Sequence, residues 1–350
     1  MFSRRSVLKS LGLAGAAAGW GGVSPQVPSA QISQPQQAPH KMWTPNPEAE
    51  RMVRDFPAPG VKKIGIPYRA RKGKIKFPND ARVAALVFVS LDYFIAPPVQ
   101  RPDALFKVDF WELSETSEYN FSIGGWRALE TLEKNGIKST VFATGFGLTK
   151  YPAIHKQFHD QGHEIAAHGW DSRKGMVMYT APQEAECIRA TTDKVAEVTG
   201  ERPAGWLSPQ VQCTERTFKL LADAGYSWHA DLRDDDIPYG LKIGDKTLIE
   251  IPFRTMTTDD YGIWGPGRGR AGMDPETSAE YFKEVLELYV ETGETWPVLL
   301  VFGVHPYTSA LPDRIRAVDR ILQTLKSHPK VWMVQYKTLA EYWKKNYVNV

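Results

Sequence analysis

From residue 81 onward, short apolar runs alternate with amphipathic segments, and this alternation limits the folds that the chain can adopt. The run at 84–90 is almost wholly apolar, whereas residues 124–135 carry apolar side chains at helical spacing. Repeated strand–helix units of this kind form a mostly parallel sheet covered by helices. Seven or so such units predict a single-domain α/β fold, a distorted (β/α)7-type barrel over residues 81–346 with functional residues at the carboxyl ends of its strands.

Glycine, proline and threonine mark several helix ends. Thr214 is suited to an N-cap and Gly225 to the stop of the same helix, and Gly200 follows another helical segment. The predicted strands cover residues 84–90, 139–143, 164–166, 226–229, 248–253, 298–302 and 331–334, and the predicted helices cover 124–135, 152–161, 182–199, 214–224, 275–292, 312–327 and 338–344.

Residues 1–30 have the features of an export signal. Arg4 and Arg5 precede a weakly hydrophobic run rich in Gly and Ala, and a small residue, Ala30, follows at a plausible cleavage site. Paired arginines in this position are typical of twin-arginine signals, which predicts a periplasmic or secreted protein. The run is too short to span a bilayer, so we expect no membrane contact after its removal. Residues 31–80 begin with many Pro and Gln residues and predict an extended arm or linker.

The charge and the cysteines exclude several function classes. Arg4, Arg5 and Lys9 account for the net charge of +3, because residues 1–30 contain no acidic residue. A near-neutral mature chain gives no support to nucleic-acid binding. Cys187 and Cys213 do not form a Cys-x-x-Cys pair, which argues against thiolate zinc clusters; they are read as buried small side chains or as one disulfide. The sequence leaves a homo-oligomer open.

Proton-transfer groups follow three of the predicted strands. Asp92 comes after the run at 84–90, and His305 comes after the run at 298–302. His168 closes a third strand-like segment. Because the carboxyl ends of parallel strands meet at one edge of a sheet, these groups should converge on a shared cavity, and one carboxylate with two imidazoles indicates hydrolytic chemistry.

One of these segments carries a resemblance to a known family. Gly162-His163-Glu164-Ile165 followed by His168 resembles the second motif of the NodB-type polysaccharide deacetylases, whose fold is an irregular (β/α) barrel. The resemblance covers roughly residues 80–345 and is strongest to the branch of metal-independent allantoinases and related cyclic-amide hydrolases. Its further matches are residues 199–206, 235–239, 251–253 and 311–317.

This resemblance implies a hydrolase that acts on carbon–nitrogen bonds other than peptide bonds. It assigns Asp92 as the general base that activates water and His305 as the general acid that protonates the leaving nitrogen. His168 would orient the substrate or the water, or hold a metal ion. His163 is read as a structural histidine that supports the turn.

Several residues expected for a metal-dependent member are replaced. The second metal-binding imidazole would stand four residues after His168, where this chain has Ser172, and neither Tyr93 nor Phe94 supplies the second carboxylate after Asp92. His168 is then the only retained ligand. The prediction is therefore no cofactor, with a divalent metal such as zinc as the alternative and Asp171 as a substitute ligand.

Four residues are predicted to bind substrate. Trp170 and Trp206 would form apolar walls, with core packing as the competing reading, and backbone amides or Ser208 would stabilise an oxyanion. Asp236, in the acidic stretch 234–236, would belong to a substrate loop, although such a stretch is more often simply solvated.

Three interpretations of function remain open at this point. The replaced ligands favour a small amide, cyclic amide or ureide as substrate, whereas export favours a metal-dependent deacetylase of N-acetylated sugars such as chitooligosaccharides or peptidoglycan. The third is a degenerate barrel that binds carbohydrate without catalysis. It is suggested by the loss of the family's second acid at Phe94, of its second histidine at Ser172, and of the arginine that orients the catalytic Asp at Leu207.

Overall fold

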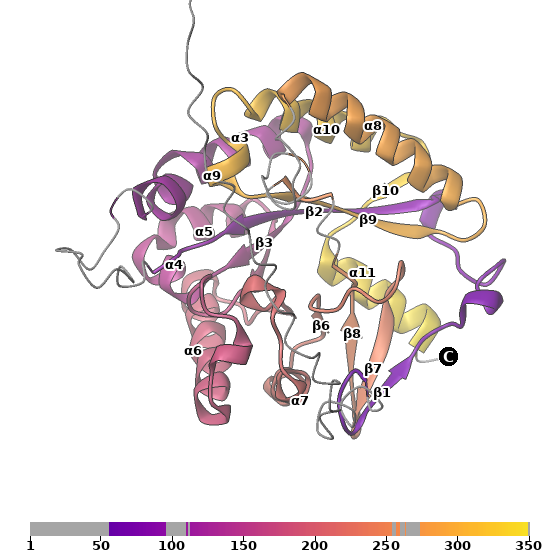
Figure 1. The fold of residues 1–350 in the computed structure, drawn as a ribbon, viewed down its shortest axis with the longest axis horizontal. Coiled ribbons are helices and arrows are strands. Elements are labelled where there is room, and N and C mark those ends of the chain that lie inside the picture. Colours follow the sequence, from indigo (N-terminus) through magenta and orange to yellow (C-terminus); the bar gives the residue numbers. More distant parts are fainter. Residues whose placement is uncertain are drawn as a thin grey trace, which may run out of the picture. The chain divides into compact units, whose positions relative to one another are not determined.

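The apolar runs form one ten-stranded sheet built around β2 (Val83–Leu91). The computed structural model describes residues 56–95, 110, 113–253, 257–259, 263 and 274–348 (Figure 1). β2 pairs in parallel with β9 (Val298–Val304) along most of its length, with β10 (Val331–Met333) near its start and with β3 (Thr140–Ala143) near its end. This long central strand therefore organises much of the sheet.

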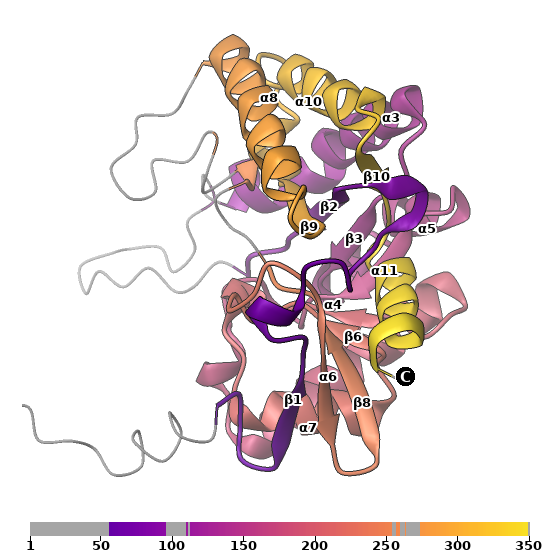
Figure 2. The same ribbon diagram turned by 90° about the vertical axis from the view of Figure 1, so that its right-hand side faces the viewer.

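Beyond β3 the sheet continues to an antiparallel edge. The parallel strands β4 (Glu164–Ala167), β5 (Gly205–Trp206), β6 (Trp228–His229) and β8 (Lys246–Glu250) follow in that order. β7 (Tyr239–Ile243) and β1 (Val61–Ile64) then pair antiparallel at the edge, which lies low in Figure 2. Past β8, Thr258 forms a parallel bridge with Gly303 of β9, so the curved sheet approaches closure as a barrel.

Alternation along β2 separates two apolar layers. Val83, Ala85, Val87, Val89 and Leu91 belong to the layer under the surrounding helices, and the intervening side chains face the interior of the sheet. The outer helices are α3 (Gly125–Asn135), α4 (Gly145–Lys150), α5 (Pro152–Asp160), α6 (Ala181–Thr199), α7 (Glu215–Ala224), α8 (Pro275–Thr292) and α10 (Ile315–Ser327).

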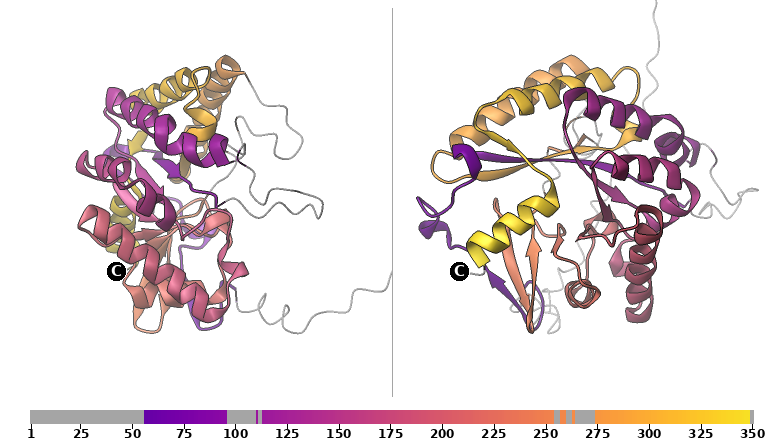
Figure 3. Two further views of the ribbon diagram at one scale, coloured as in Figure 1. Left: turned by 90° about the vertical axis from the view of Figure 1, so that its left-hand side faces the viewer. Right: turned by 180° about the vertical axis from the view of Figure 1, so that it is seen from behind.

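The interior is closed at the amino-terminal ends of the strands by α11 (Tyr336–Trp343), drawn in yellow in Figure 3. Its buried residues Tyr336, Leu339 and Trp343 belong to the inner apolar cluster. The Tyr336 ring stacks on Trp228 with centroids 4.9 Å apart. The opposite end of the interior, at the carboxyl ends of the strands, is left for polar side chains.

Capping explains why most predicted helix boundaries lie within a few residues of the observed ones. The Thr214 side chain accepts a hydrogen bond from the Arg216 backbone, and Gly225 ends α7 in the left-handed conformation. The short β5 and the antiparallel strands β1 and β7 were not predicted, because two to five residues between turns carry little periodicity.

The predicted arm over residues 31–80 is wrong for the part of it that the structure describes. β1 pairs with β7, and Ile75 and Phe77 are buried in the interior cluster. Residues 56–80 are therefore part of the barrel. Their composition predicted a linker, but the segment contains apolar side chains that are buried. The predicted export signal and residues 31–55 lie outside the described residues.

Neither cysteine is bonded. Cys187 is buried and Cys213 is partly buried, and both are free thiols. The alternative of a disulfide is therefore not realised. Of the helices in the described part of the chain, none combines the length and the apolar character that a membrane span needs.

Candidate active site

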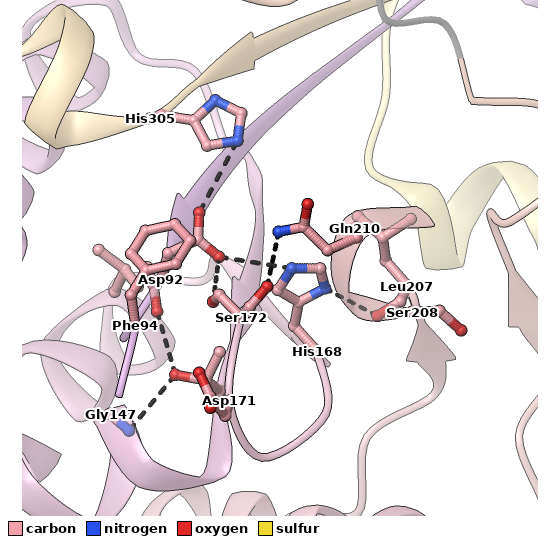
Figure 4. Close-up of polar contacts among 12 residues, drawn as sticks. Asp92, Phe94, Gly147, His168, Asp171, Ser172, Leu207, Ser208, Gln210 and His305 are labelled. Carbon is pink, nitrogen blue, oxygen red and sulfur yellow. Dashed lines mark hydrogen bonds and ion pairs between the residues drawn. The ribbon is translucent and has the colours of Figure 1, made fainter. Parts of the chain in front are cut away.

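Asp92, His168 and His305 all point into the interior at the carboxyl ends of their strands (Figure 4). Asp92 continues the inward series of Phe88 and Ser90 along β2. His168 follows the inward Ala166 by two residues, in the same alternation. The prediction that three separate strand ends bring these groups together therefore agrees with the geometry.

The Asp92 carboxylate is the centre of the site and is only 4% exposed. Its Oδ1 accepts a hydrogen bond of 2.6 Å from the Ser172 hydroxyl and lies 3.4 Å from His168 Nε2. Its Oδ2 lies 3.8 Å from His305 Nε2. One carboxylate is thus placed between two imidazole rings.

The backbone fixes the orientation of His168. Its Nδ1 lies 2.7 Å from the Leu207 carbonyl oxygen, which can only accept a hydrogen bond, so Nδ1 carries a proton. Nε2 is then the atom directed at Asp92. His163 has no such role, because its Nδ1 accepts a hydrogen bond from the Ser139 backbone N–H, away from the cavity.

His305 is held by a buried aspartate that sequence reasoning missed. Asp259, fully buried, accepts hydrogen bonds of 2.6 Å from both the Nδ1 and the backbone N–H of His305, and a further one from the Ser309 hydroxyl. Because the Asp259 carboxylate can only accept, Nδ1 carries a proton, and Nε2 is the atom directed at Asp92. Little in the sequence pointed to Asp259, because it lies six residues past the predicted strand at 248–253.

The imidazoles determine the charge state of Asp92. Burial alone raises the pKa of this carboxyl, but the hydrogen bond and charge of His168, the charge of His305 and the Ser172 hydroxyl outweigh it and lower the pKa to about 2. Asp92 is therefore ionised at neutral pH. The carboxylate assigned as the general base is thus stabilised in its charged form.

The three groups open into a cavity of about 240 Å³. Phe88 lies in its wall with its ring 5.8 Å from that of His305, and a Cβ at position 303 would come within 2.2 Å of the Phe88 ring. Glycine at 303 therefore makes room for this aromatic wall. The lining residues are Phe88, Ser90, Asp92, Phe94, His168, Ser172, Leu207, Gln210, Val211, Arg233, Phe253, Thr258, His305 and Tyr307.

The loop after β5 is strained where it borders the cavity. Gln210 and Val211 adopt φ values of 59° and 53°, which are unusual for residues other than glycine. Gln210 Nε2 donates a hydrogen bond of 2.7 Å to the Ser172 carbonyl and so ties this loop to the one that follows His168. Gln210 and Arg233 contribute polar groups to the cavity that the sequence did not single out.

Trp206 and Ser208, predicted to bind substrate, lie on the wrong face of the sheet. Trp206 is fully buried in the outer layer and donates from Nε1 to the Ser208 hydroxyl, 2.9 Å away. Ser208 donates from its backbone and its hydroxyl to Asp231, at 2.6 and 2.8 Å. Because Leu207 faces the cavity, its two neighbours must face away from it.

Trp170 and Asp236 also lie away from the cavity. The Trp170 ring packs in the outer layer against Gly145, where an added Cβ would come within 2.3 Å of it. Asp236 is exposed, and its backbone carbonyl accepts a hydrogen bond from the Leu299 N–H. The prediction that these two residues bind substrate is therefore not supported by their positions.

The donor atoms at this site do not fit a zinc ion held by three protein ligands. The residue in the place of the second imidazole, Ser172, supplies a neutral hydroxyl that donates to Asp92. Asp171, the proposed substitute, instead accepts from the backbone N–H groups of Ile95 and Arg173. Among the residues whose positions are described, no group of three His, Cys, Asp or Glu is arranged to hold a metal ion. The absence of a cofactor stays a prediction.

The sequence is similar to those of polysaccharide deacetylases. Residues 124–229 match the family model described as polysaccharide deacetylase. The peptidoglycan deacetylase of Helicobacter pylori is 28% identical over 245 residues, which cover 63% of this chain and 83% of that relative. A putative polysaccharide deacetylase of Schizosaccharomyces pombe is 23% identical over 65% of this chain and 74% of that relative.

Solved structures share the fold. A probable polysaccharide deacetylase from Pseudomonas aeruginosa has a TM-score of 0.66 and 25% identity, over 77% of this chain and 93% of its own. The structure of Puue allantoinase has a TM-score of 0.69 and 24% identity, over 80% of this chain and 96% of its own. These comparisons confirm the predicted NodB-type barrel, the polysaccharide deacetylase-like domain and the hydrolase class.

Proposed function

We propose that this chain, a polysaccharide deacetylase-like hydrolase of carbon–nitrogen bonds, cleaves an amide with Asp92 as base and His305 as acid. The observation that carries the proposal is the placement of Asp92 Oδ2 3.8 Å from His305 Nε2 in one cavity. This separation lets both side chains reach a single amide group bound beside them in the cavity.

The charge states suit the two roles. With a pKa of about 2, Asp92 is ionised under assay conditions, so it orients the attacking water and accepts its proton as the new C–O bond forms. When the C–N bond breaks, the leaving nitrogen takes a proton from His305 Nε2. Asp259, hydrogen-bonded at Nδ1, stabilises the His305 ring while it carries that proton.

In this proposal His168, rather than the predicted Ser208, stabilises the oxyanion. The Ser208 hydroxyl is committed to Asp231, outside the cavity, whereas His168 Nε2 faces the position of the attacked carbonyl beside Asp92. A ring that already donates from Nδ1 to Leu207 can donate from Nε2 to the oxyanion when both nitrogens are protonated.

The proposed substrate is a small amide, cyclic amide or ureide. Ser172 removes one imidazole from the ligand set of a metal-dependent deacetylase, and a cavity of about 240 Å³ suits a small molecule. The second candidate is an N-acetylated sugar, which is favoured by the 28% identity to the H. pylori peptidoglycan deacetylase.

Parallel assays separate these candidates. The purified protein is incubated with cyclic imides, ureides, chitooligosaccharides and peptidoglycan, before and after treatment with a chelator, and its metal content is measured. Chelator-resistant turnover of the small amides supports the first candidate. Chelator-sensitive release of acetate from the glycans supports the second candidate. Binding of glycans without any turnover supports a degenerate carbohydrate-binding barrel.

We also propose that residues 1–30 direct export, because Arg4 and Arg5 precede the weakly hydrophobic run. Replacing both arginines by lysine should retain the precursor in the cytoplasm, as detected by fractionation and immunoblotting. Normal export of the double variant would contradict twin-arginine targeting. A homo-oligomer stays a prediction, to be measured by light scattering.

A further inference from the structure

The two strands that carry the proposed base and acid are not joined by backbone pairing where the chemistry takes place. The β2–β9 ladder ends at the pair Val89–Val304. Asp92 lies three residues past this pair on one strand, and His305 lies one residue past it on the other. Some other contact must therefore set the separation of the two side chains.

A strap formed by residues 117–127 provides such contacts. It includes η4 (Asn120–Gly124), which packs against α9 (Pro306–Ser309), the short helix that follows His305. On one side, the Ser117 hydroxyl hydrogen-bonds both the N–H and the carbonyl of Phe94. On the other side, Tyr119 donates to the Ala310 carbonyl, 3.3 Å away.

Asn120 is the residue of the strap that reaches both sides at once. Its side chain is fully buried. Nδ2 donates a hydrogen bond of 2.9 Å to the Asp92 carbonyl, and Oδ1 accepts one of 2.8 Å from the Tyr307 N–H. A single carboxamide thus joins the backbone of the proposed base to the backbone two residues beyond the proposed acid.

We infer that Asn120 is a positioning residue that sets the distance between the Asp92 carboxylate and the His305 ring. The importance of this distance for catalysis rests on the proposed function. The structural part of the inference does not depend on that function. The carboxamide is rigid and buried, and its two ends hydrogen-bond different chain segments. Small displacements of reacting groups have large kinetic effects, so loss of this bridge should act on turnover.

The first test uses Asn120→Ala, with Asn135→Ala as the matched control. Asn135 is also a buried asparagine of this region, but it hydrogen-bonds Thr131 and Asp319 at the far end of α3. We expect Asn120→Ala to lower kcat about 10- to 100-fold with little change in KM. Asn135→Ala should lose thermal stability and retain kcat. Asn120→Ser replaces the alanine variant if that variant does not fold.

The pH dependence of kcat/KM gives a readout that a stability defect does not move. Asp92 faces His168 and His305, His305 faces Asp92 and Asp259, and Arg233 lines the same cavity. If the bridge sets the distance, removing it weakens the interaction of Asp92 with His305. The acid limb of the profile should then move to higher pH and the basic limb to lower pH, which narrows the profile. Asn135→Ala should keep the wild-type width.

A crystal structure of Asn120→Ala tests the inference without turnover. The Asp92 Oδ2–His305 Nε2 separation of 3.8 Å should lengthen by about 1 Å or more. An unchanged separation, or kinetics indistinguishable from those of Asn135→Ala, overturns the inference. If the wild-type protein hydrolyses none of the substrates, the proposed function fails, and the crystallographic comparison still decides the role of Asn120.

Discussion

Two clusters of imidazole and carboxylate lie at the strand ends of this sheet, on opposite faces of it. Asp92, His168 and His305 open into the cavity, whereas His229 and Glu250 are both fully buried in the outer layer, with His229 Nε2 2.9 Å from Glu250 Oε2. The two clusters use the same side-chain types. The direction in which the side chain leaves the strand decides whether such a group can meet a substrate.

The two clusters also differ in charge balance. The cavity has one carboxylate between two rings, which lowers the pKa of Asp92 to about 2. In the outer cluster, burial lowers the pKa of His229, but Glu250 and Asp231 outweigh it and raise the pKa to about 9. The Phe218 ring of α7 lies 5.2 Å from the His229 ring and covers it. We interpret the outer cluster as structural and the cavity cluster as chemical.

The largest expected effect is a loss of activity on substitution in the cavity cluster. Asp92→Asn keeps the shape of the side chain but removes the base, so kcat/KM should fall about 10²- to 10⁴-fold in a protein that still folds. Steady-state kinetics together with circular dichroism make the measurement. Activity within about threefold of wild type would contradict the assignment of Asp92.

The next largest expected effect is a loss of stability at the outer cluster. Glu250→Ala leaves His229 buried without its partner and removes the acceptor of the Leu232 N–H, so unfolding should require about 3–5 kcal/mol less. Denaturant unfolding measures this loss, and kcat of the folded enzyme should be retained. The control, Glu294→Ala, breaks an exposed ion pair with Arg82 and should cost about 0–1 kcal/mol.

Measuring the free energy of unfolding as a function of pH distinguishes the two clusters further. The pKa of His229 rises from 6.5 to about 9 on folding, so its contribution is present in full below pH 6.5 and is lost as the pH rises through 9. Asp92 has the opposite sign, because its lowered pKa stabilises the fold above pH 3.8 and the contribution is lost as the pH falls through 2. Glu250→Gln should make the free energy of unfolding less dependent on pH in the alkaline range and leave its fall in the acid range unchanged.

The smallest effect tests the face assigned to Ser208. Ser208→Ala removes the hydroxyl that donates to Asp231 and accepts from Trp206 Nε1, which should cost about 1–3 kcal/mol of stability. Because the hydroxyl does not line the cavity, kcat should change little. A loss of turnover comparable to that of Asp92→Asn would restore the oxyanion role predicted from the sequence.

The part of the site that lies on long strands was predictable, and the part on short strands and loops was not. The apolar run at 84–90 determines the face of β2 to which Asp92 belongs, and the run at 298–302 does the same for His305. β5 has only two residues, so the alternation that turns Trp206 outward and Leu207 inward is hard to detect. Asp259 and Asn120 follow no strand alternation, and their partners are distant in sequence.

The helix α11 has a consequence for how the barrel is completed during synthesis. It follows every strand of the sheet in the sequence, and yet Tyr336, Leu339 and Trp343 supply the floor of the interior. While the ribosome is still translating these residues, Phe142 and Trp228 lack the Tyr336 ring that packs against both of them. The nascent barrel therefore cannot acquire its finished interior until this helix has emerged and docked.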